Sequence, residues 1–253
     1  MLAIIDRTGL AQLSNLKIIH RQVMRTPYGE PSGALTFARL GEQEIMFLAR
    51  HSASHAIPAH RVNYRANLWA LQEQGARRVI SIALAGGIRA DLSPGTVIVP
   101  DQIIDYTYGR EFTFFDERDQ PPKHIDFSLP YTPSLRQKIL DAAQRINTPC
   151  LNGGVYAAMQ GPRLETVAEV NRMERDGADM VGMTGMPEAA LARELGLDYA
   201  AIAVIVNHAA GRGSSINGVH MESINAVTQP AMAQVRGILE NIVSHDGEYG
   251  NGN

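Results

Sequence analysis

The stretch QGPRLETVAEVNRMERDGADMVGMTGMPEAALARELG, residues 160–196, decides the fold and holds most of the candidate functional residues. Its first half carries apolar side chains at helical spacing and ends at Gly177, which predicts an amphipathic helix with a glycine stop. A short apolar strand is expected over residues 179–183. A second helix is expected over residues 187–196, because proline suits the first turn of a helix and glycine its C-terminal end. A strand that passes through small residues into a helix start is where α/β proteins place ligands.

The rest of the chain alternates short apolar runs with helical patterns, which predicts an α/β fold with helices flanking a twisted mixed β-sheet. Strands are expected over residues 2–5, 35–39, 44–49, 78–85, 96–104, 155–159 and 199–206, and helices over residues 62–74, 134–145 and 221–243, the last as one or two helices. No linker divides the interior, so residues 1–245 are expected to form one domain, with residues 246–253 as a disordered tail.

Composition limits the classes of function that the protein can have. A net charge of -3 and the lack of a Lys/Arg run argue against a nucleic-acid partner. No run of about 18 apolar residues occurs, and the first residues lack a signal-peptide pattern, so we expect no membrane association and a cytoplasmic location. The single cysteine, Cys150, excludes an intrachain disulfide and a cysteine metal cluster, and we expect it to be a buried apolar side chain.

Small, basic and amide-bearing residues stand at the ends of the expected strands. They are Thr8-Gly9, Arg50-His51, Gly86-Gly87, Met183-Thr184 and Asn207. We expect them to meet at one edge of the sheet and to form a binding site there. For Gly86-Gly87 and for Asn207, the sequence leaves two interpretations open in each case. Gly86-Gly87 is either a tight turn or a place where backbone N–H groups approach an anion, and the Asn207 amide either caps its strand or binds a ligand.

A segment with three histidines, His51, His55 and His60, follows one of the expected strands. Two histidines four residues apart can share a metal ion on a helix, but Pro58 interrupts the segment and no acidic or cysteine ligand lies nearby in the sequence. We therefore expect no metal site, and we interpret the segment as a polar loop at the rim of a cleft. Residues 105–133 are irregular and rich in aromatic side chains, which is typical of a segment that covers a site or an interface and favours an oligomer.

Several long blocks resemble the trimeric purine nucleoside and methylthioadenosine phosphorylase family. They are ARH at residues 49–51, VNYRANLWAL at 62–71, AGGI at 85–88, QGPRLET at 160–166 and GMTGMPE at 182–188, and the likeness extends from residue 3 to about residue 243. No Walker loop, Gly-x-Gly-x-x-Gly fingerprint, nucleophile elbow or zinc-protease motif competes with it. The resemblance implies a single-domain nucleoside phosphorylase-like fold and a homotrimer. It also implies phosphorolysis, in which inorganic phosphate attacks C1′ of a purine nucleoside and releases free purine and ribose 1-phosphate, with no other cofactor.

Position by position, the resemblance implies a phosphate site made by Thr8, Arg50, His51 and Thr184 and by backbone N–H groups near Leu84 and Ala85. For the nucleoside it implies Met183 under the ribose, Leu164 beside the substrate, Met221 near the 5′ position, and the catalytic pair Glu165 and Asn207 on the purine. Hydroxyls and a fixed guanidinium suit a phosphate dianion. Catalysis then consists of placing this anion below C1′ and stabilising the charge that moves onto the purine.

The pair Glu165 and Asn207 implies a preference among purines. A 6-oxopurine offers an N1–H donor to the carboxylate and an O6 acceptor to the amide, whereas adenine has a bare N1 and an amino group. We therefore expect S-methyl-5′-thioinosine or a related 6-oxopurine nucleoside as the substrate. A mismatched buried polar pair costs about 1–3 kcal/mol, which gives a preference without excluding adenine.

The 5′ group and the first loop leave alternatives open. Met221 suits a methylthio group, but a shift of one residue would put His220 there, which suits a 5′-hydroxyl. The family's first loop reads Gly-Gly-Thr-Gly or Gly-Ser-Gly, whereas this chain has DRTG at residues 6–9. Asp6 beside a phosphate would repel it by about 4 kcal/mol at about 4 Å unless Arg7 offsets the repulsion. The alternatives are therefore a methylthioadenosine phosphorylase, a nucleoside-binding homologue with an impaired phosphate site, and hydrolysis by water in the same cleft.

Overall fold

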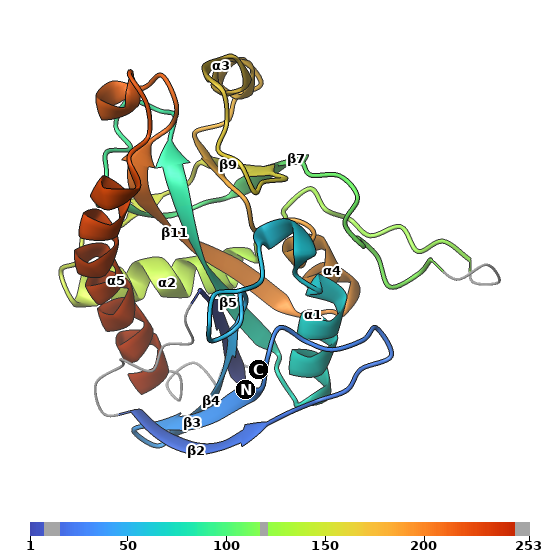
Figure 1. Cartoon of the computed structure of the whole chain (residues 1–253). Helices are drawn as coiled ribbons and strands as arrows, with labels where there is room; N and C mark the ends of the chain where they lie inside the picture. The colour runs from blue at the N-terminus through green and yellow to red at the C-terminus, as the bar shows by residue number, and fades with distance from the viewer. Residues whose placement is uncertain (8–15, 117–120, 246–253) are drawn as a thin grey trace.

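The computed structural model describes residues 1–7, 16–116 and 121–245, and within them eleven strands form one mixed sheet (Figure 1). The strands are β1 (Leu2–Asp6), β2 (Leu16–Gln22), β3 (Leu35–Leu40), β4 (Gln43–Ala49), β5 (Arg78–Gly87), β6 (Val97–Val99), β7 (Gln102–Tyr106), β8 (Leu151–Asn152), β9 (Val155–Met159), β10 (Met180–Gly182) and β11 (Asp198–His208). The helices are α1 (Tyr64–Glu73), α2 (Pro133–Arg145), α3 (Val167–Arg175), α4 (Glu188–Glu194) and α5 (Met221–Ser244), with short 3-10 turns at Ala59–Arg61 and Gly213–Ser215. The α/β class and the mixed sheet are as the sequence predicts, while the tail expected at residues 246–253 lies outside the described residues.

The sheet is built around β5, which pairs with three other strands. β1 and β11 run parallel to it, and β10 meets its C-terminal end in the antiparallel sense. The order is β2-β3-β4-β1-β5-β10-β9-β7, while β11 pairs with β5 and β6, and β6 also pairs with β8. β5 and β11 are almost entirely buried, as expected for strands that are covered on both faces.

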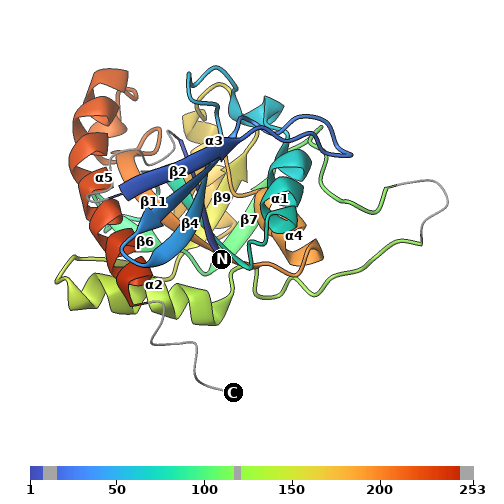
Figure 2. The same ribbon diagram turned by 90° about the horizontal axis from the view of Figure 1, so that it is seen from below.

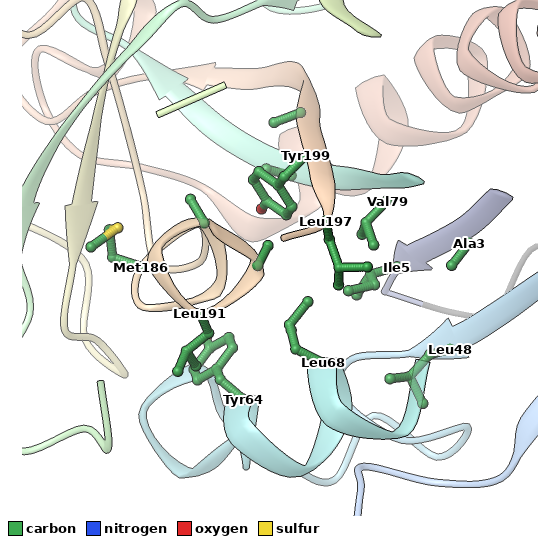
Figure 3. Packing of buried hydrophobic residues seen from close by; sticks show 14 of the residues in the cluster. Ala3, Ile5, Leu48, Tyr64, Leu68, Val79, Met186, Leu191, Leu197 and Tyr199 are labelled. Carbon is green, nitrogen blue, oxygen red and sulfur yellow. The ribbon is translucent and has the colours of Figure 1, made fainter. Parts of the chain in front are cut away.

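Helices cover both faces of this sheet. Because alternate residues of a strand point to opposite faces, neighbouring residues of β1 belong to different apolar clusters. Ile5 packs in the cluster that includes Leu68 of α1, Leu191 of α4 and Tyr199 of β11 (Figure 3). Ile4 packs in the other cluster, which α2 and α5 cover. Figures 1 and 2 show α1 and α4 together on one side of the sheet and α5 and α2 on the other.

The structure differs from the expected elements at four places, the smallest of which is the two-residue strand β8, which the sequence does not predict. Residues 96–104 form two strands rather than one, because Pro100 has no N–H for a ladder and the chain changes partner there, from β11 for β6 to β9 for β7. The edge strand β2 is exposed along most of its length, so it lacks the buried apolar pattern by which strands are recognised. The segment expected as one or two helices is the single helix α5, which contains Pro230.

Among the strands that lead to candidate site residues, β10 runs against the expected direction, and this changes how Thr184 reaches the site. The sequence predicts that all the strand ends meet at one edge of the sheet, but β10 runs antiparallel to β5, with Met180 opposite Gly87. β10 pairs in parallel with β9, which fixes this direction. The chain therefore enters β10 at the expected edge and runs back along β5. Met183 and Thr184 lie beside the body of β5 instead of beyond its tip.

Candidate active site

A cavity of about 780 Å³ opens over the C-terminal half of β5. Its walls come from β5, β10 and β11, from the loop after β4, from the loop between β9 and α3, and from one side of α5. Cavities of about 300–1,000 Å³ hold small molecules and cofactors in proteins. The volume therefore suits a ligand of the size of a nucleoside together with a small anion.

The residues that the resemblance assigns to the site come together in this cavity. Its lining includes Arg50, His51, Leu84, Ala85, Leu164, Glu165, Met183, Thr184, Asn207 and Met221. Thr8, the remaining candidate, lies outside the described residues. The lining residues come from segments that are far apart in the sequence, and the sheet brings them to one place.

Arg50 is almost completely buried and is held by an ion pair with Glu188, the first residue of α4. Its Nε donates to Glu188 Oε2 at 2.7 Å, and its Nη2 donates to Glu188 Oε1 at 3.0 Å and to Ser81 Oγ at 2.6 Å. Its Nη1 donates to the carbonyl oxygen of Ile82 at 3.0 Å. A guanidinium has five N–H hydrogens, so these four bonds leave one hydrogen on Nη1 for a ligand.

Glu188 is saturated by hydrogen bonds in the same network. Besides Arg50, it accepts from Ser81 Oγ at 2.6 Å and from Tyr199 Oη at 2.8 Å. Burial would raise the pKa of Glu188, but the Arg50 charge and these hydrogen bonds outweigh it and lower the pKa. Both members of the pair therefore stay ionised, and their charges cancel. From the sequence, Glu188 is only a favourable residue at a helix start, and the ion pair was missed.

His51 follows Arg50, and its ring is oriented by the backbone. Its Nδ1 lies 2.8 Å from the carbonyl oxygen of Ile57, and because a carbonyl oxygen can only accept, this nitrogen carries the proton. Burial and the neighbouring Arg50 charge lower the pKa of His51, which favours the neutral ring. In that form Nε2 is a hydrogen-bond acceptor.

The edge of β5 offers backbone groups to the cavity. β1 pairs with β5 only as far as Ser81, and β10 meets β5 only at Gly86 and Gly87. Among the described residues, the backbone between these points carries no ladder hydrogen bonds on that side, and this is where Leu84 and Ala85 line the cavity. A strand edge of this kind presents N–H groups that a ligand can use.

Of the two interpretations left open for the glycines at the end of β5, the structure excludes the tight turn, and Gly86 lines the cavity. Both remain in the strand, so they do not form a tight turn. A Cβ at Gly86 would lie 3.2 Å from Asn207 Nδ2, and a Cβ at Gly87 would lie 2.1 Å from the carbonyl oxygen of Leu92. Gly86 thus leaves room for Asn207, and Gly87 allows a loop to pack directly against the strand.

Thr184 and Met183 follow β10 into the cavity. Thr184 is buried, with its hydroxyl 3.5 Å from Tyr156 Oη. Met183 is half-buried and packs under Gly161, where a Cβ would lie 2.6 Å from the Met183 sulfur. Gly161 also has a φ of 65°, in the left-handed region that favours glycine, and any other side chain there would displace the Met183 side chain.

Glu165 and Asn207 supply a carboxylate and an amide to the same cavity. Burial raises the pKa of Glu165 above its usual range. Asn207 lies at an irregularity in the pairing of β11 with β5, and its amide nitrogen donates to the carbonyl oxygen of His208 at 2.6 Å. This bond fixes the amide orientation and leaves one N–H hydrogen and the oxygen for a ligand.

At the start of α5 and at the end of β1, only one residue of each neighbouring pair lines the cavity. Met221 lines the cavity, and His220 is not part of its wall. Arg7 lines the cavity, whereas Asp6 is completely buried and is not part of the wall. The Asp6 carboxylate, which would repel a phosphate, is therefore not exposed in the cavity wall.

Arg110 is a structural residue of the site that the sequence does not indicate. It comes from the aromatic-rich segment and is 8% exposed. It forms hydrogen bonds with the loops around the cavity, and none of the acceptors is a carboxylate. Its acceptors are the carbonyl oxygens of Met159, Gln160, Met183 and Met186, the Gln160 side chain and Tyr64 Oη. It thereby ties the loop after β9 to the loop after β10. No described residue of 105–133 lines the cavity of its own chain.

The described residues contain neither a cluster that could hold a metal ion nor a helix that could span a membrane. In residues 1–7, 16–116 and 121–245, no group of three His, Cys, Asp or Glu side chains could hold a metal ion. No helix in this part of the chain is long and apolar enough to cross a membrane. Cys150, expected to be buried, is only partly buried beside the cluster under α2 and α5, and burial raises the pKa of its thiol to about 11.

Comparison with known proteins identifies the class to which this fold and cavity belong. Residues 2–244 match the family model of the Phosphorylase superfamily, and the chain belongs to that superfamily. Over 242 residues, which are 96% of this chain and 98% of the relative, it is 47% identical to the probable S-methyl-5′-thioinosine phosphorylase of Pseudomonas syringae pv. tomato. Over 195 residues, 75% of this chain and 73% of the relative, it is 43% identical to the 6-oxopurine nucleoside phosphorylase of Pyrococcus furiosus.

A solved structure agrees with these relatives. The methylthioadenosine phosphorylase of Schistosoma mansoni in complex with adenine superposes with a TM-score of 0.91 at 30% identity, covering 98% of this chain and 92% of that one. The nucleoside phosphorylase-like fold that the sequence predicts is therefore confirmed.

Proposed function

We propose that the protein catalyses the phosphorolysis of a purine nucleoside, with S-methyl-5′-thioinosine as the preferred substrate. The products would be hypoxanthine and 5-methylthioribose 1-phosphate. The observation that carries this proposal is that a single cavity is lined by Arg50, His51 and Thr184 and also by Glu165 and Asn207. The relatives named as S-methyl-5′-thioinosine and 6-oxopurine nucleoside phosphorylases support the same reaction.

In this proposal inorganic phosphate, the co-substrate, binds where the edge of β5 meets the loop after β4. The ligands are the remaining Nη1 hydrogen of Arg50, the Thr184 hydroxyl and the backbone N–H groups near Leu84 and Ala85. Neutral His51 would accept a hydrogen bond from a P–OH group through Nε2. Because an oxocarbenium-like sugar needs little covalent help, correct placement of the anion below C1′ supplies much of the catalysis.

The purine binds between Glu165 and Asn207. The Asn207 amide has one N–H left to donate as negative charge builds on the leaving purine, and the ionised Glu165 accepts from the ring N1–H. This arrangement favours a 6-oxopurine over adenine. Leu164 and Met183 line the same space and would pack against the substrate.

The 5′ position is assigned to a methylthio group because Met221, and not His220, lines the cavity. A thioether side chain packs favourably against an apolar sulfur substituent, and it offers no donor to a 5′-hydroxyl. The same geometry makes inosine a poorer substrate rather than an excluded one.

We also propose that the protein acts as a homotrimer in the cytoplasm. The support is the resemblance of the sequence to trimeric phosphorylases and the aromatic-rich segment 106–115, which does not line the cavity of its own chain. Tyr108 and Phe112 in that segment are 72% and 69% exposed, which is costly for aromatic side chains unless a neighbouring subunit covers them.

Base release with and without phosphate tests the proposed function. We would assay methylthioinosine, methylthioadenosine, inosine and adenosine, and expect release only with phosphate, fastest from methylthioinosine. Release that is indifferent to phosphate would identify a hydrolase. No release from any nucleoside, combined with thermal stabilisation by hypoxanthine and none by phosphate, would identify a binding protein without the reaction.

A further inference from the structure

The candidate phosphate ligands bring almost no net positive charge. Arg50 is neutralised by Glu188, with which it shares two hydrogen bonds in the protein interior. His51 is held neutral by burial and by the adjacent Arg50 charge. Thr184 and the backbone N–H groups are uncharged. From these candidate ligands, an anion with up to two negative charges would therefore receive hydrogen bonds but no uncompensated positive charge.

Arg7 lies where such a cation is needed. It follows β1, whose last residue, Asp6, is in register with Ala49 of β4. The backbone N–H of Arg50 donates to the carbonyl oxygen of Asp6 at 2.7 Å, so Arg7 and Arg50 leave the sheet side by side. Arg7 lines the cavity, and its charge is one of the causes that lower the pKa of His51, which lies in the same wall.

The charge of Arg7 is not used elsewhere in the described part of the protein. No ion pair joins Arg7 to a carboxylate among the described residues, in contrast to Arg50 with Glu188 and Arg163 with Glu169. Its side chain is exposed, so it can move to a ligand without breaking a buried contact. The neighbouring Asp6 carboxylate is buried and does not line the cavity, so it does not oppose an anion there directly.

We propose that Arg7 is a phosphate-binding residue and supplies the uncompensated positive charge of the phosphate site. This inference rests on the proposed function and adds Arg7 to the phosphate ligands that the resemblance implies. The phosphate would bridge the Arg7 guanidinium and the remaining Nη1 hydrogen of Arg50, whose charge Glu188 neutralises. A guanidinium can bind two phosphate oxygens at once, which an ammonium group cannot do with the same geometry.

Steady-state kinetics with phosphate as the varied substrate tests this inference. Arg7→Gln removes the charge and should raise the KM for phosphate about tenfold, as expected for a charge-assisted hydrogen bond at an exposed position. Arg7→Lys keeps the charge and should raise it less. At saturating phosphate, kcat and the KM for the nucleoside should stay near their wild-type values, and so should the melting temperature, because the side chain is exposed.

Arg61→Gln is the matched control, because Arg61 is also exposed and follows the cavity-lining Ala59 without lining the cavity itself. It should leave the KM for phosphate unchanged. Added sodium chloride should raise the KM of the wild type more than that of Arg7→Gln, since screening weakens only a charge that is present.

Two results would overturn the inference while leaving the proposed function intact. One is a phosphate KM for Arg7→Gln within twofold of both the wild type and Arg61→Gln. The other is an equal loss of kcat at saturating phosphate in Arg7→Gln and Arg7→Lys, which would indicate a structural role. Absence of phosphate-dependent base release in the wild-type protein would instead refute the proposed function itself.

Discussion

The buried pair of Arg50 and Glu188 gives a prediction that depends on the structure and not on the enzymatic activity. Glu188→Gln keeps the size of the side chain but removes its charge and turns one acceptor into a donor. Arg50 then keeps a positive charge in the interior, with an amide N–H facing a guanidinium N–H. Ser81 and Tyr199 can still donate to the one oxygen that remains.

The expected cost is large because both side chains are almost inaccessible, 1% exposed for Arg50 and 0% for Glu188. Removing one partner of a buried ion pair typically destabilises a protein by about 3–5 kcal/mol. In a chain of this size each kcal/mol shifts the melting temperature by about 2–4 °C. Glu188→Gln should therefore lower the melting temperature by roughly 10 °C.

Thermal unfolding of the purified variant without ligands measures this effect, and Glu44→Gln provides the control. Arg39 and Glu44 also form an ion pair at 2.8 Å, but their side chains are 51% and 46% exposed. An exposed pair contributes at most about 1 kcal/mol, so this variant should unfold within a few degrees of the wild type. If Glu188→Gln unfolds at the temperature of Glu44→Gln, the buried ion pair is not as we describe it.

Four further predictions concern the nucleoside. Glu165→Gln should reduce turnover of 6-oxopurine nucleosides by about 10- to 100-fold relative to adenine nucleosides, the equivalent of about 1–3 kcal/mol, and an unchanged substrate ratio would count against the role of this carboxylate. Burial raises the pKa of Glu165 above 4.5, so the carboxylate that accepts the hydrogen bond is lost as the pH falls through that raised value. Inosine turnover by the wild type should fall over the same pH range. If Glu165→Gln shows the same fall in turnover, Glu165 is not its source. Gly161→Ala adds a Cβ 2.6 Å from the Met183 sulfur at a positive φ, so it should lower stability by about 1 kcal/mol or more and raise the KM for the nucleoside. A variant with wild-type stability and an unchanged KM would contradict this prediction. Met221→Ala should reduce kcat/KM a few-fold for methylthioinosine and less for inosine, because the exposed thioether packs only part of the 5′ group; equal losses for both would argue that Met221 does not contact that group.

Local pattern was sufficient for most of the fold. β5 and β11 are apolar runs of the length and composition of fully buried strands, and α1 is bounded by an asparagine cap and a glycine, so each has a clear signal in the sequence. The direction of β10 has no such signal. It depends on pairing with β9 and β5, which is a property of the folded chain.

Most of the predicted site residues lie in continuous blocks of the family pattern, and Leu84, Asn207 and Met221 lie outside those blocks. Such blocks place Met183, Thr184 and Glu165, and these residues do line the cavity. The partner of Arg50 was not predictable, because Glu188 is 138 residues away and its position after a proline has a sufficient local explanation. Arg110 was also missed, because its acceptors are mostly backbone carbonyl oxygens, which every residue carries and which give no signal in a sequence.

The fate of inorganic phosphate tests the central claim most directly. We would incubate the protein with S-methyl-5′-thioinosine and phosphate, follow phosphate and sugar phosphate by ³¹P NMR, and measure hypoxanthine in the same samples. A phosphorylase consumes one phosphate and forms one sugar 1-phosphate for each hypoxanthine released. Hypoxanthine that accumulates while the inorganic phosphate signal stays constant would contradict the proposed reaction, because the cavity would then be delivering water to C1′ instead of the anion.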